Sequence, residues 1–324
     1  MTQLIKLLNA ALVSTVLMLS SQGMAQDFPV RTIRVVLITE AGSGTDAHAR
    51  QLADGLAAEL GQSVIIEPRG GGGGIIGTRI VAQATPNGYT IGFFTPPIVT
   101  NLHSVKNPGY RLDDFAVVGG VGQAYHGMLI NNVRAPVKTL QEFITYAREN
   151  PGKLNFGSTG PSTTTNILTQ RLMAATGIKL VEINYKGGNP AGVALLAGEI
   201  QLYFNTLAQV AQRLQFKQIS ALGMTGDERS PRYPNLPTFR ELGYPALTNS
   251  TWYVVAAPAA LPAPILRKLR DAVAKVRASQ QFRDYLGKVE IAPASTTPEQ
   301  FADFMKKESL RVAEDFKRIG IKPE

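Results

Sequence analysis

The sequence contains no cysteine, and this absence removes several chemistries at once. Disulfide bonds, thiolate-bound metals and cysteine nucleophiles are excluded, and so is a lipid-anchored lipoprotein, which needs a thiol to acylate. Histidine is scarce too: the sequence has three, His48, His103 and His126, and they lack the spacing of a zinc site such as H-E-x-x-H. A G-x-S-x-G nucleophile elbow is also missing. We therefore expect a protein that is not an enzyme and that carries no metal or cofactor.

Blocks of charge of one sign are missing as well. The sequence has 33 Lys and Arg against 24 Asp and Glu, a formal net charge of +9, but its basic residues are scattered. Neither an Arg- or Lys-rich block nor an aromatic RNA-binding signature occurs. We predict that nucleic acid is not a partner, and we interpret the charge as a mild attraction for small anions.

Long apolar runs are confined to the N-terminus. Lys6 precedes an apolar run over residues 7–19, and the stretch G-M-A at 23–25 follows, which is the pattern of a secretory signal peptide. The run is too short for a stable membrane anchor, and no later segment is apolar enough to span a membrane. We therefore predict that residues 1–25 are a signal peptide that is removed, so that the mature chain begins near Gln26.

Short β-branched runs alternate with helical patterns through the rest of the chain, which is typical of α/β domains with largely parallel sheets. A leucine at every fourth position predicts a helix over residues 47–60, a capping box of Thr139 and Glu142 begins another, and Thr238 with Glu241 begins a short one that ends at Gly243. The C-terminal third is mostly helical. The strands that we predict cover residues 33–38, 64–67, 90–94, 128–131, 154–156, 181–185, 200–205, 219–224 and 252–256.

Two junctions between a predicted strand and a helix are rich in hydrogen-bond donors. The first is A-G-S-G-T-D at residues 41–46, and the second is N-F-G-S-T-G-P-S-T-T-T-N at 155–166. The first N–H groups of a helix have no partner inside it and the helix dipole favours negative charge there, so such a junction binds anions. Each junction could instead only cap its helix, because Ser and Thr are the usual N-caps. Two junctions of this kind predict one anionic ligand held between two lobes.

A glycine cluster needs a separate interpretation. Gly72, Gly74 and Gly77 fit the dinucleotide-binding pattern G-x-G-x-x-G. That fingerprint should follow a strand directly, and an acidic residue should end the next strand. Here five consecutive glycines follow residues 68–69, and the next predicted strand ends in two phenylalanines, at 93–94. We predict a tightly turned or flexible loop at the edge of the cleft.

Several segments, in this order and spacing, resemble one protein family. They are P-V-R-T-I at 29–33, G-T-D at 44–46 with A-R at 49–50, G-Q-S-V at 61–64, P-N-G-Y-T at 86–90, N-P-G-K-L-N-F-G-S at 150–158, Y-K-G-G at 185–188, R-S-P at 229–231, P-T at 237–238, and W-Y at 252–253 with A-P at 257–258. The sequence resembles the periplasmic substrate-binding receptors of tripartite tricarboxylate transporters, the TctC or Bug family, over essentially the whole mature chain. The resemblance implies a periplasmic protein that captures a small organic carboxylate and delivers it to the permease subunits of a membrane transporter.

The resemblance also implies a fold and a site. The fold is α/β: a two-lobed periplasmic-binding-protein fold, in which each lobe is a mostly parallel sheet flanked by helices and the ligand cleft lies between the lobes. We place the first lobe at residues 27–124 plus 251–324 and the second at 125–250. The ligand-binding residues that we predict are Gly42, Ser43, Gly44 and Thr45 in the first lobe, Ser158, Thr159, Thr163, Thr164 and Asn205 in the second, and His126 where the chain crosses between them.

Glu40 departs from the family pattern, which commonly has Pro, Ala or Gly just ahead of the first junction. A carboxylate aimed into a closed cleft repels an anionic ligand. Glu40 therefore points away, is paired, or meets an amine or hydroxyl of the ligand. The ligand is a mono- or dicarboxylate, an aromatic acid or an amino acid, bound by a monomer. The alternatives are a ligand sensor that docks on a membrane signalling protein and a secreted enzyme that acts on small organic acids.

Overall fold

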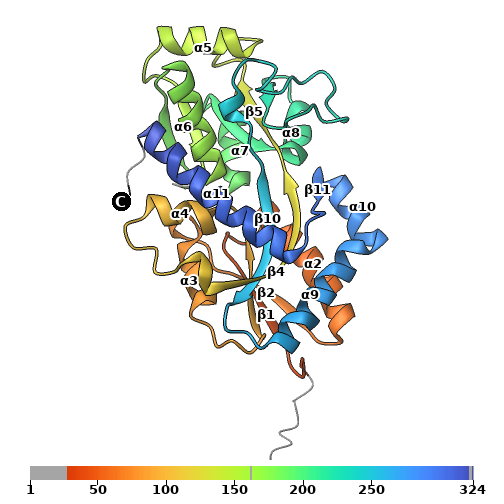
Figure 1. The fold of residues 1–324 in the computed structure, drawn as a ribbon. Coiled ribbons are helices and arrows are strands. Elements are labelled where there is room, and N and C mark those ends of the chain that lie inside the picture. Colours follow the sequence, from red (N-terminus) through yellow and green to blue (C-terminus); the bar gives the residue numbers. More distant parts are fainter. Residues whose placement is uncertain (1–27, 161–162, 321–322, 324) are drawn as a thin grey trace, which may run out of the picture.

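The computed structural model describes residues 28–160, 163–320 and 323, so the predicted signal peptide lies outside the described residues. The described residues form two sheets with helices packed on both faces of each (Figure 1). We call the six-stranded sheet with its helices the first lobe and the five-stranded sheet with its helices the second lobe. Over the described residues, no helix combines the length and the apolar character that crossing a membrane requires.

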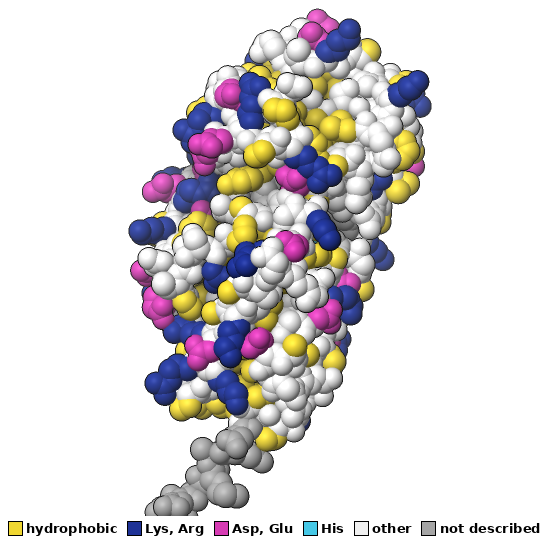
Figure 2. All heavy atoms as spheres, turned by 90° about the vertical axis from the view of Figure 1, so that its right-hand side faces the viewer, with side chains coloured by type: hydrophobic (Ala, Val, Ile, Leu, Met, Phe, Trp, Pro, Cys, Tyr) yellow, Lys and Arg dark blue, Asp and Glu magenta, His cyan; other side chains and the backbone are white. Residues whose placement is uncertain are grey.

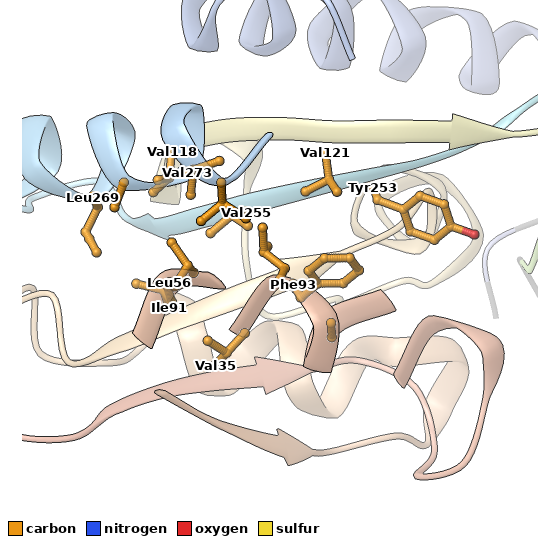
Figure 3. Close-up of a cluster of buried hydrophobic side chains, with 14 of the residues drawn as sticks. Val35, Leu56, Ile91, Phe93, Val118, Val121, Tyr253, Val255, Leu269 and Val273 are labelled. Carbon is orange, nitrogen blue, oxygen red and sulfur yellow. The ribbon is translucent and has the colours of Figure 1, made fainter. Parts of the chain in front are cut away.

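The first lobe is built on a sheet with the strand order β11-β4-β10-β3-β1-β2. Its strands are β1 (Ile33–Leu37), β2 (Val64–Pro68), β3 (Thr90–Phe94), β4 (Phe115–Ala124), β10 (Thr251–Pro258) and β11 (Ile291–Pro293). One face is covered by α2 (Gly44–Leu60), α9 (Ala263–Ala278) and α10 (Gln280–Lys288), and the other by α3 (Ile75–Ala82), α4 (Pro97–Ser104) and α11 (Pro298–Ile319). Figure 3 shows Leu56 of α2 and Val273 of α9 packed against strand residues such as Ile91 and Val255.

The second lobe has the strand order β7-β6-β8-β5-β9. Its strands are β5 (His126–Asn131), β6 (Asn155–Ser158), β7 (Val181–Asn184), β8 (Leu202–Thr206) and β9 (Ile219–Met224). The helices α5 (Leu140–Glu149) and α6 (Thr164–Thr176) pack on one face, and α7 (Gly188–Ala197) and α8 (Leu207–Leu214) pack on the other. Figure 2 shows Lys and Arg side chains interspersed with Asp and Glu on one side of the molecule.

Both sheets are mixed, whereas we predicted mostly parallel ones. The pairs β1·β2, β1·β3, β6·β7 and β6·β8 are parallel, but β10 is antiparallel to β3 and β4, and β5 is antiparallel to β8 and β9. The reason is the path of the chain. β4 leads out of the first lobe and β10 leads back into it, so these paired strands run in opposite directions.

The strand β4 was not predicted because its sequence, F-A-V-V-G-G-V-G-Q-A, is rich in glycine, which strands generally avoid. The structure shows why the glycines are there. A Cβ atom at Gly119 would lie 2.8 Å from Val273 of α9, and one at Gly122 would lie 2.7 Å from the carbonyl oxygen of Ala292 in β11. Glycine therefore lets a helix and an edge strand approach β4 closely.

The predicted short helix after Thr238 is wrong. The N–H of Glu241 donates to the Thr238 hydroxyl at 3.1 Å and the N–H of Thr238 donates to the Glu241 carboxylate at 2.7 Å, so the capping bonds form. The chain nevertheless continues as turns up to Gly243. Reciprocal capping bonds are therefore compatible with a turn when no packed helix follows.

The C-terminal helix α11 contacts both lobes. It packs on α4 and β4 of the first lobe and reaches α6 of the second (Figure 1). Ile167 of α6 joins a buried cluster that contains Trp252 and Phe301 of the first lobe. One turn further along α6, the Arg171 guanidinium lies 2.6 Å from the Asp315 carboxylate of α11, and both side chains are buried. We call this the α6–α11 contact.

Candidate functional site

A cleft of about 640 Å³ lies between the two lobes. Its walls come from the start of α2 and the glycine loop in the first lobe, from the start of α6 and the ends of β7 and β8 in the second, and from the crossing strands. Of the ten residues that we predicted, eight line the cleft: Ser43, Gly44, Thr45, Thr159, Thr163, Thr164, Asn205 and His126. The other two, Gly42 and Ser158, are not among the lining residues.

The first junction presents the N-terminus of α2 to the cleft. Ser43 is the N-cap, and its hydroxyl accepts a hydrogen bond from the Asp46 N–H at 3.1 Å. The N–H of Gly42 donates to the Asp46 carboxylate at 2.8 Å, so this group is already bonded. Asp46 thus holds the loop. Gly44 and Thr45, the first two helical residues, have N–H groups without a carbonyl partner inside the helix, and both residues line the cleft.

The second junction is ordered by a fully buried serine. The Ser158 hydroxyl donates to the Asn184 side-chain oxygen at 2.5 Å and accepts from the Gly160 N–H at 3.1 Å. Ser158 therefore links the ends of β6 and β7 and bends the chain toward α6. This is a structural contribution to the site in place of the ligand contact that we predicted.

Threonine hydroxyls line the cleft at the start of α6. Thr163 is the N-cap, and its hydroxyl donates to the Gly160 carbonyl at 2.7 Å. The Thr165 hydroxyl accepts from the Thr159 N–H at 3.2 Å, while the Thr164 hydroxyl accepts from the hydroxyl of Thr251 at 3.0 Å. Thr164 keeps its own proton for a further acceptor, because a hydroxyl both accepts and donates. A second array of donors thus faces the first across the cleft.

Asn205 adds a donor with a defined orientation. The residue is 3% exposed, and its side-chain oxygen accepts from the Thr206 N–H at 2.9 Å. This bond fixes which end of the amide is oxygen and which is nitrogen. The nitrogen Nδ2 has no hydrogen-bond partner among the described residues. Because Asn205 lines the cleft, this amide favours a ligand group that accepts hydrogen bonds.

Two histidines of the cleft are uncharged at neutral pH. Burial lowers the pKa of His126 to about 4 and that of His48 to about 4. His48, on α2, lies against Tyr253, and its Nδ1 is 2.7 Å from the Tyr285 hydroxyl. The two neutral imidazoles therefore contribute no positive charge to the cleft.

The glycine loop and Glu40 complete the first-lobe wall. The cleft is lined by Gly70 through Gly74, with positive φ from Gly71 to Gly74, and the helix that follows is short. Glu40 also lines the cleft, and among the described residues its carboxylate has no hydrogen-bond or ion-pair partner. Lys186, at the end of β7, is the lining residue of opposite charge.

Sequence reasoning missed several residues that line the cleft: His48, Thr165, Tyr203, Gln209, Thr251 and Tyr253. Thr165 lies within the second junction and could have been found from its hydroxyl. The others come from positions that only the tertiary fold brings together, and their local sequence carries no signal. For the described part of the chain, no group of three His, Cys, Asp or Glu residues is arranged to hold a metal ion.

Acidification should destabilise the protein through these buried histidines. The pKa of His126 is about 4 in the folded protein and returns to its ordinary value of 6.5 on unfolding. Between these two values the unfolded chain binds a proton that the folded chain does not, so the free energy of unfolding falls as the pH is lowered from 6.5 to 4. We expect His126 to contribute a loss of about 1–3 kcal/mol over this interval.

Urea unfolding at a series of pH values measures this loss. The variant His126→Gln cannot titrate there, so its free energy of unfolding should fall less steeply than that of the natural protein. Equal slopes for the two proteins would show that folding does not lower the pKa of His126.

The comparisons with known proteins agree with this geometry. The family model described as "Tripartite tricarboxylate transporter family receptor" matches residues 48–321. The "UPF0065 protein in gbd 5'region" of Cupriavidus necator is 31% identical over 301 residues, which cover 93% of this chain and 91% of that protein. The solved periplasmic binding protein BugD has a TM-score of 0.86 at 29% identity and covers 92% of this chain and 100% of its own. An R. palustris protein solved with adipate has the same TM-score of 0.86, the same 29% identity and the same coverage. These neighbours confirm the predicted fold class.

Proposed function

Since the chain belongs to the family of tripartite tricarboxylate transporter receptors, we propose that it captures a small organic carboxylate between its lobes and delivers it to the permease subunits of such a transporter. It acts in the periplasm as a monomer, with residues 1–25 as the export signal. The role is binding without catalysis. A structural neighbour that was solved with adipate supports a carboxylate as the ligand class.

The observation that carries this proposal is the pair of helix N-termini at one cleft. α2 of the first lobe and α6 of the second both begin at lining residues, and each start carries hydroxyl or free N–H groups. Donors at a helix start suit a carboxylate, because they match its acceptor oxygens and its negative charge. The predicted residues Gly44, Thr45, Thr159, Thr163 and Thr164 would hold it, with Asn205 as an additional donor.

We propose that capture works by closure. The lobes, residues 27–124 plus 251–324 and residues 125–250, meet at the crossings where β4 passes into β5 and where β10 begins. A ligand that contacts both helix starts binds the closed arrangement better than the open one, and only such differential affinity shifts the equilibrium. The closed form is then the one that the permease recognises. A sensor that docks on a signalling protein would use the same capture step, whereas turnover of the ligand would favour the enzyme alternative.

The ionised carboxylate should be essential for binding. Calorimetry with an acid such as adipate and with its dimethyl ester compares the same chain length with and without charged acceptors. Loss of the charge-assisted hydrogen bonds should weaken binding by about 3 kcal/mol or more, since each such bond contributes about 1.5–3 kcal/mol. Equal affinity for acid and ester would exclude a carboxylate site.

A variant locates the effect in the cleft. Thr164→Val keeps the shape of the side chain and removes its hydroxyl, so the acid should bind about 10-fold or more weakly. The matched surface variant Thr145→Val on α5 should leave the affinity unchanged. If Thr164→Val binds as tightly as the natural protein, this hydroxyl serves only its bond with Thr251.

A further inference from the structure

An unpaired carboxylate lies in the wall of the cleft. Glu40 follows β1, and its side chain rests against the backbone of Gly70, where any Cβ atom would collide with the carboxylate. Glycine at position 70 therefore leaves room for Glu40 in the cleft wall. The carboxylate has no hydrogen-bond or ion-pair partner among the described residues, although it is the side chain most able to accept hydrogen bonds there.

A second acceptor without a partner lies in the floor of the cleft. His126 is 4% exposed and lines the cleft, and its Nδ1 has no hydrogen-bond partner within the described chain. Its Nε2 is 3.5 Å from the Thr251 hydroxyl, which donates its single proton to Thr164 at 3.0 Å. With that proton assigned to Thr164, the contact between Thr251 and His126 suits a proton on Nε2, and in this tautomer Nδ1 carries a lone pair. Nδ1 is thus an acceptor.

Closing the cleft without a donor for the Glu40 carboxylate and for Nδ1 of His126 would cost free energy. Glu40 is hydrated while its wall is exposed, but closure removes water from a charge that has no partner. A plain dicarboxylate cannot offset this cost, because its oxygens only accept hydrogen bonds and its charge has the same sign. An ammonium group carries the opposite charge and three donors. It would pair with Glu40, and a neighbouring donor of the ligand would satisfy Nδ1 of His126.

We propose that Glu40 is a specificity-determining residue that accepts a ligand ammonium group, so that this receptor takes an amino-carboxylate in preference to an unsubstituted carboxylate. The proposal rests on the proposed function, since the carboxylate of the same ligand is held by the two helix starts. The two charged lining residues, Glu40 and Lys186, would then each face a ligand group of opposite charge. The ligand's cation meets Glu40, and Lys186 remains near the ligand's carboxylate in the second lobe.

The test uses matched ligands that differ only at one carbon. Calorimetry first compares succinate, malate and aspartate, and then compares glutarate with glutamate. A further pair, butyrate and 4-aminobutyrate, tests an amine that is far from the carboxylate. The amino member of a pair should bind about 10- to 100-fold more tightly than its plain partner, the range that a charge-assisted hydrogen bond gives. The hydroxyl of malate tests whether an uncharged donor at His126 is enough.

The variant Glu40→Gln keeps the size of the side chain and removes its charge. It should bind the amino member about 10-fold less tightly and the plain member more tightly, because the repulsion between like charges is gone. The control Glu59→Gln makes the same charge change on the outer surface of α2, where Glu59 lies 3.4 Å from Lys275, and should change neither affinity. Thermal unfolding of each variant confirms that it is folded.

Three results would overturn the inference. Plain or hydroxylated members that bind as tightly as the amino members would show that Glu40 does not select an ammonium group. An equal loss for all ligands in Glu40→Gln would assign Glu40 to a contact between the lobes. If no carboxylate in the set binds, the proposed function fails and this inference fails with it; binding of acids without preference for an amine leaves the function standing.

Discussion

Replacing Asp315 by alanine should lower the free energy of unfolding by about 3–5 kcal/mol, because it removes the partner of a buried charge. The Arg171 side chain is 2% exposed, and its guanidinium lies 2.6 Å from the Asp315 carboxylate. Arg311 and Arg318 also contact this carboxylate, at 3.0 and 2.8 Å, so its loss leaves three arginines close together. Chemical denaturation at neutral pH measures the change.

The matched control removes a partner at the surface. Arg318 reaches the same carboxylate, but its side chain is 59% exposed, so Arg318→Ala should cost no more than about 1 kcal/mol. A loss of less than about 1 kcal/mol in Asp315→Ala as well would mean that Arg171 finds other partners or water when the carboxylate is absent.

Ile167→Ala should destabilise the protein by about 2–5 kcal/mol, the range for deleting a buried aliphatic side chain. Ile167 is 5% exposed and packs in the same cluster as Trp252 and Phe301, so the cavity would open between the lobes. α6 carries Thr164 in its first turn, so a loosened α6 should also weaken ligand binding.

Val193, 60% exposed on α7, provides the control, since Val193→Ala should change stability by less than about 0.5 kcal/mol. If Ile167→Ala unfolds with the same free energy as the natural protein, the packing of Ile167 against the first lobe does not hold α6 in place.

The starts of α2, which lines the cleft, and of α5 were predictable because their signals are local. Ser43 and Thr139 are N-caps in the structure, and each accepts a hydrogen bond from the N–H three residues on. Both are residue types that favour caps for a reason contained in a few residues of chain. The strand β4 was not predicted because its glycines are needed for close packing against Val273, Phe301 and other side chains that are far away in the sequence.

The residues of the cleft also divide into those with a local sequence signal and those without one. The two donor-rich junctions were visible as short runs of hydroxyl residues and glycine. By contrast, His48 and Tyr253 are 205 positions apart in the sequence, and only the packing of α2 on β10 brings their rings within 5.3 Å. Nothing in the residues around His48 shows that it will be buried beside Tyr285. A single sequence therefore predicts the parts of a site that are made by one segment and misses those made by pairs of distant segments.

The strand order of the first lobe has a consequence for the synthesis of this protein. β10 lies between β3 and β4 in the sheet, yet it follows the whole second lobe along the chain. A chain that has emerged only as far as β9 therefore contains every strand of the second lobe's sheet, while the first lobe's sheet lacks the strand that joins its two parts. We expect the second lobe to fold as the earlier unit and the first lobe to keep unpaired strand edges, at β3 and on both sides of β4, until the C-terminal segment arrives. Such edges are where a partly made chain aggregates or meets a chaperone.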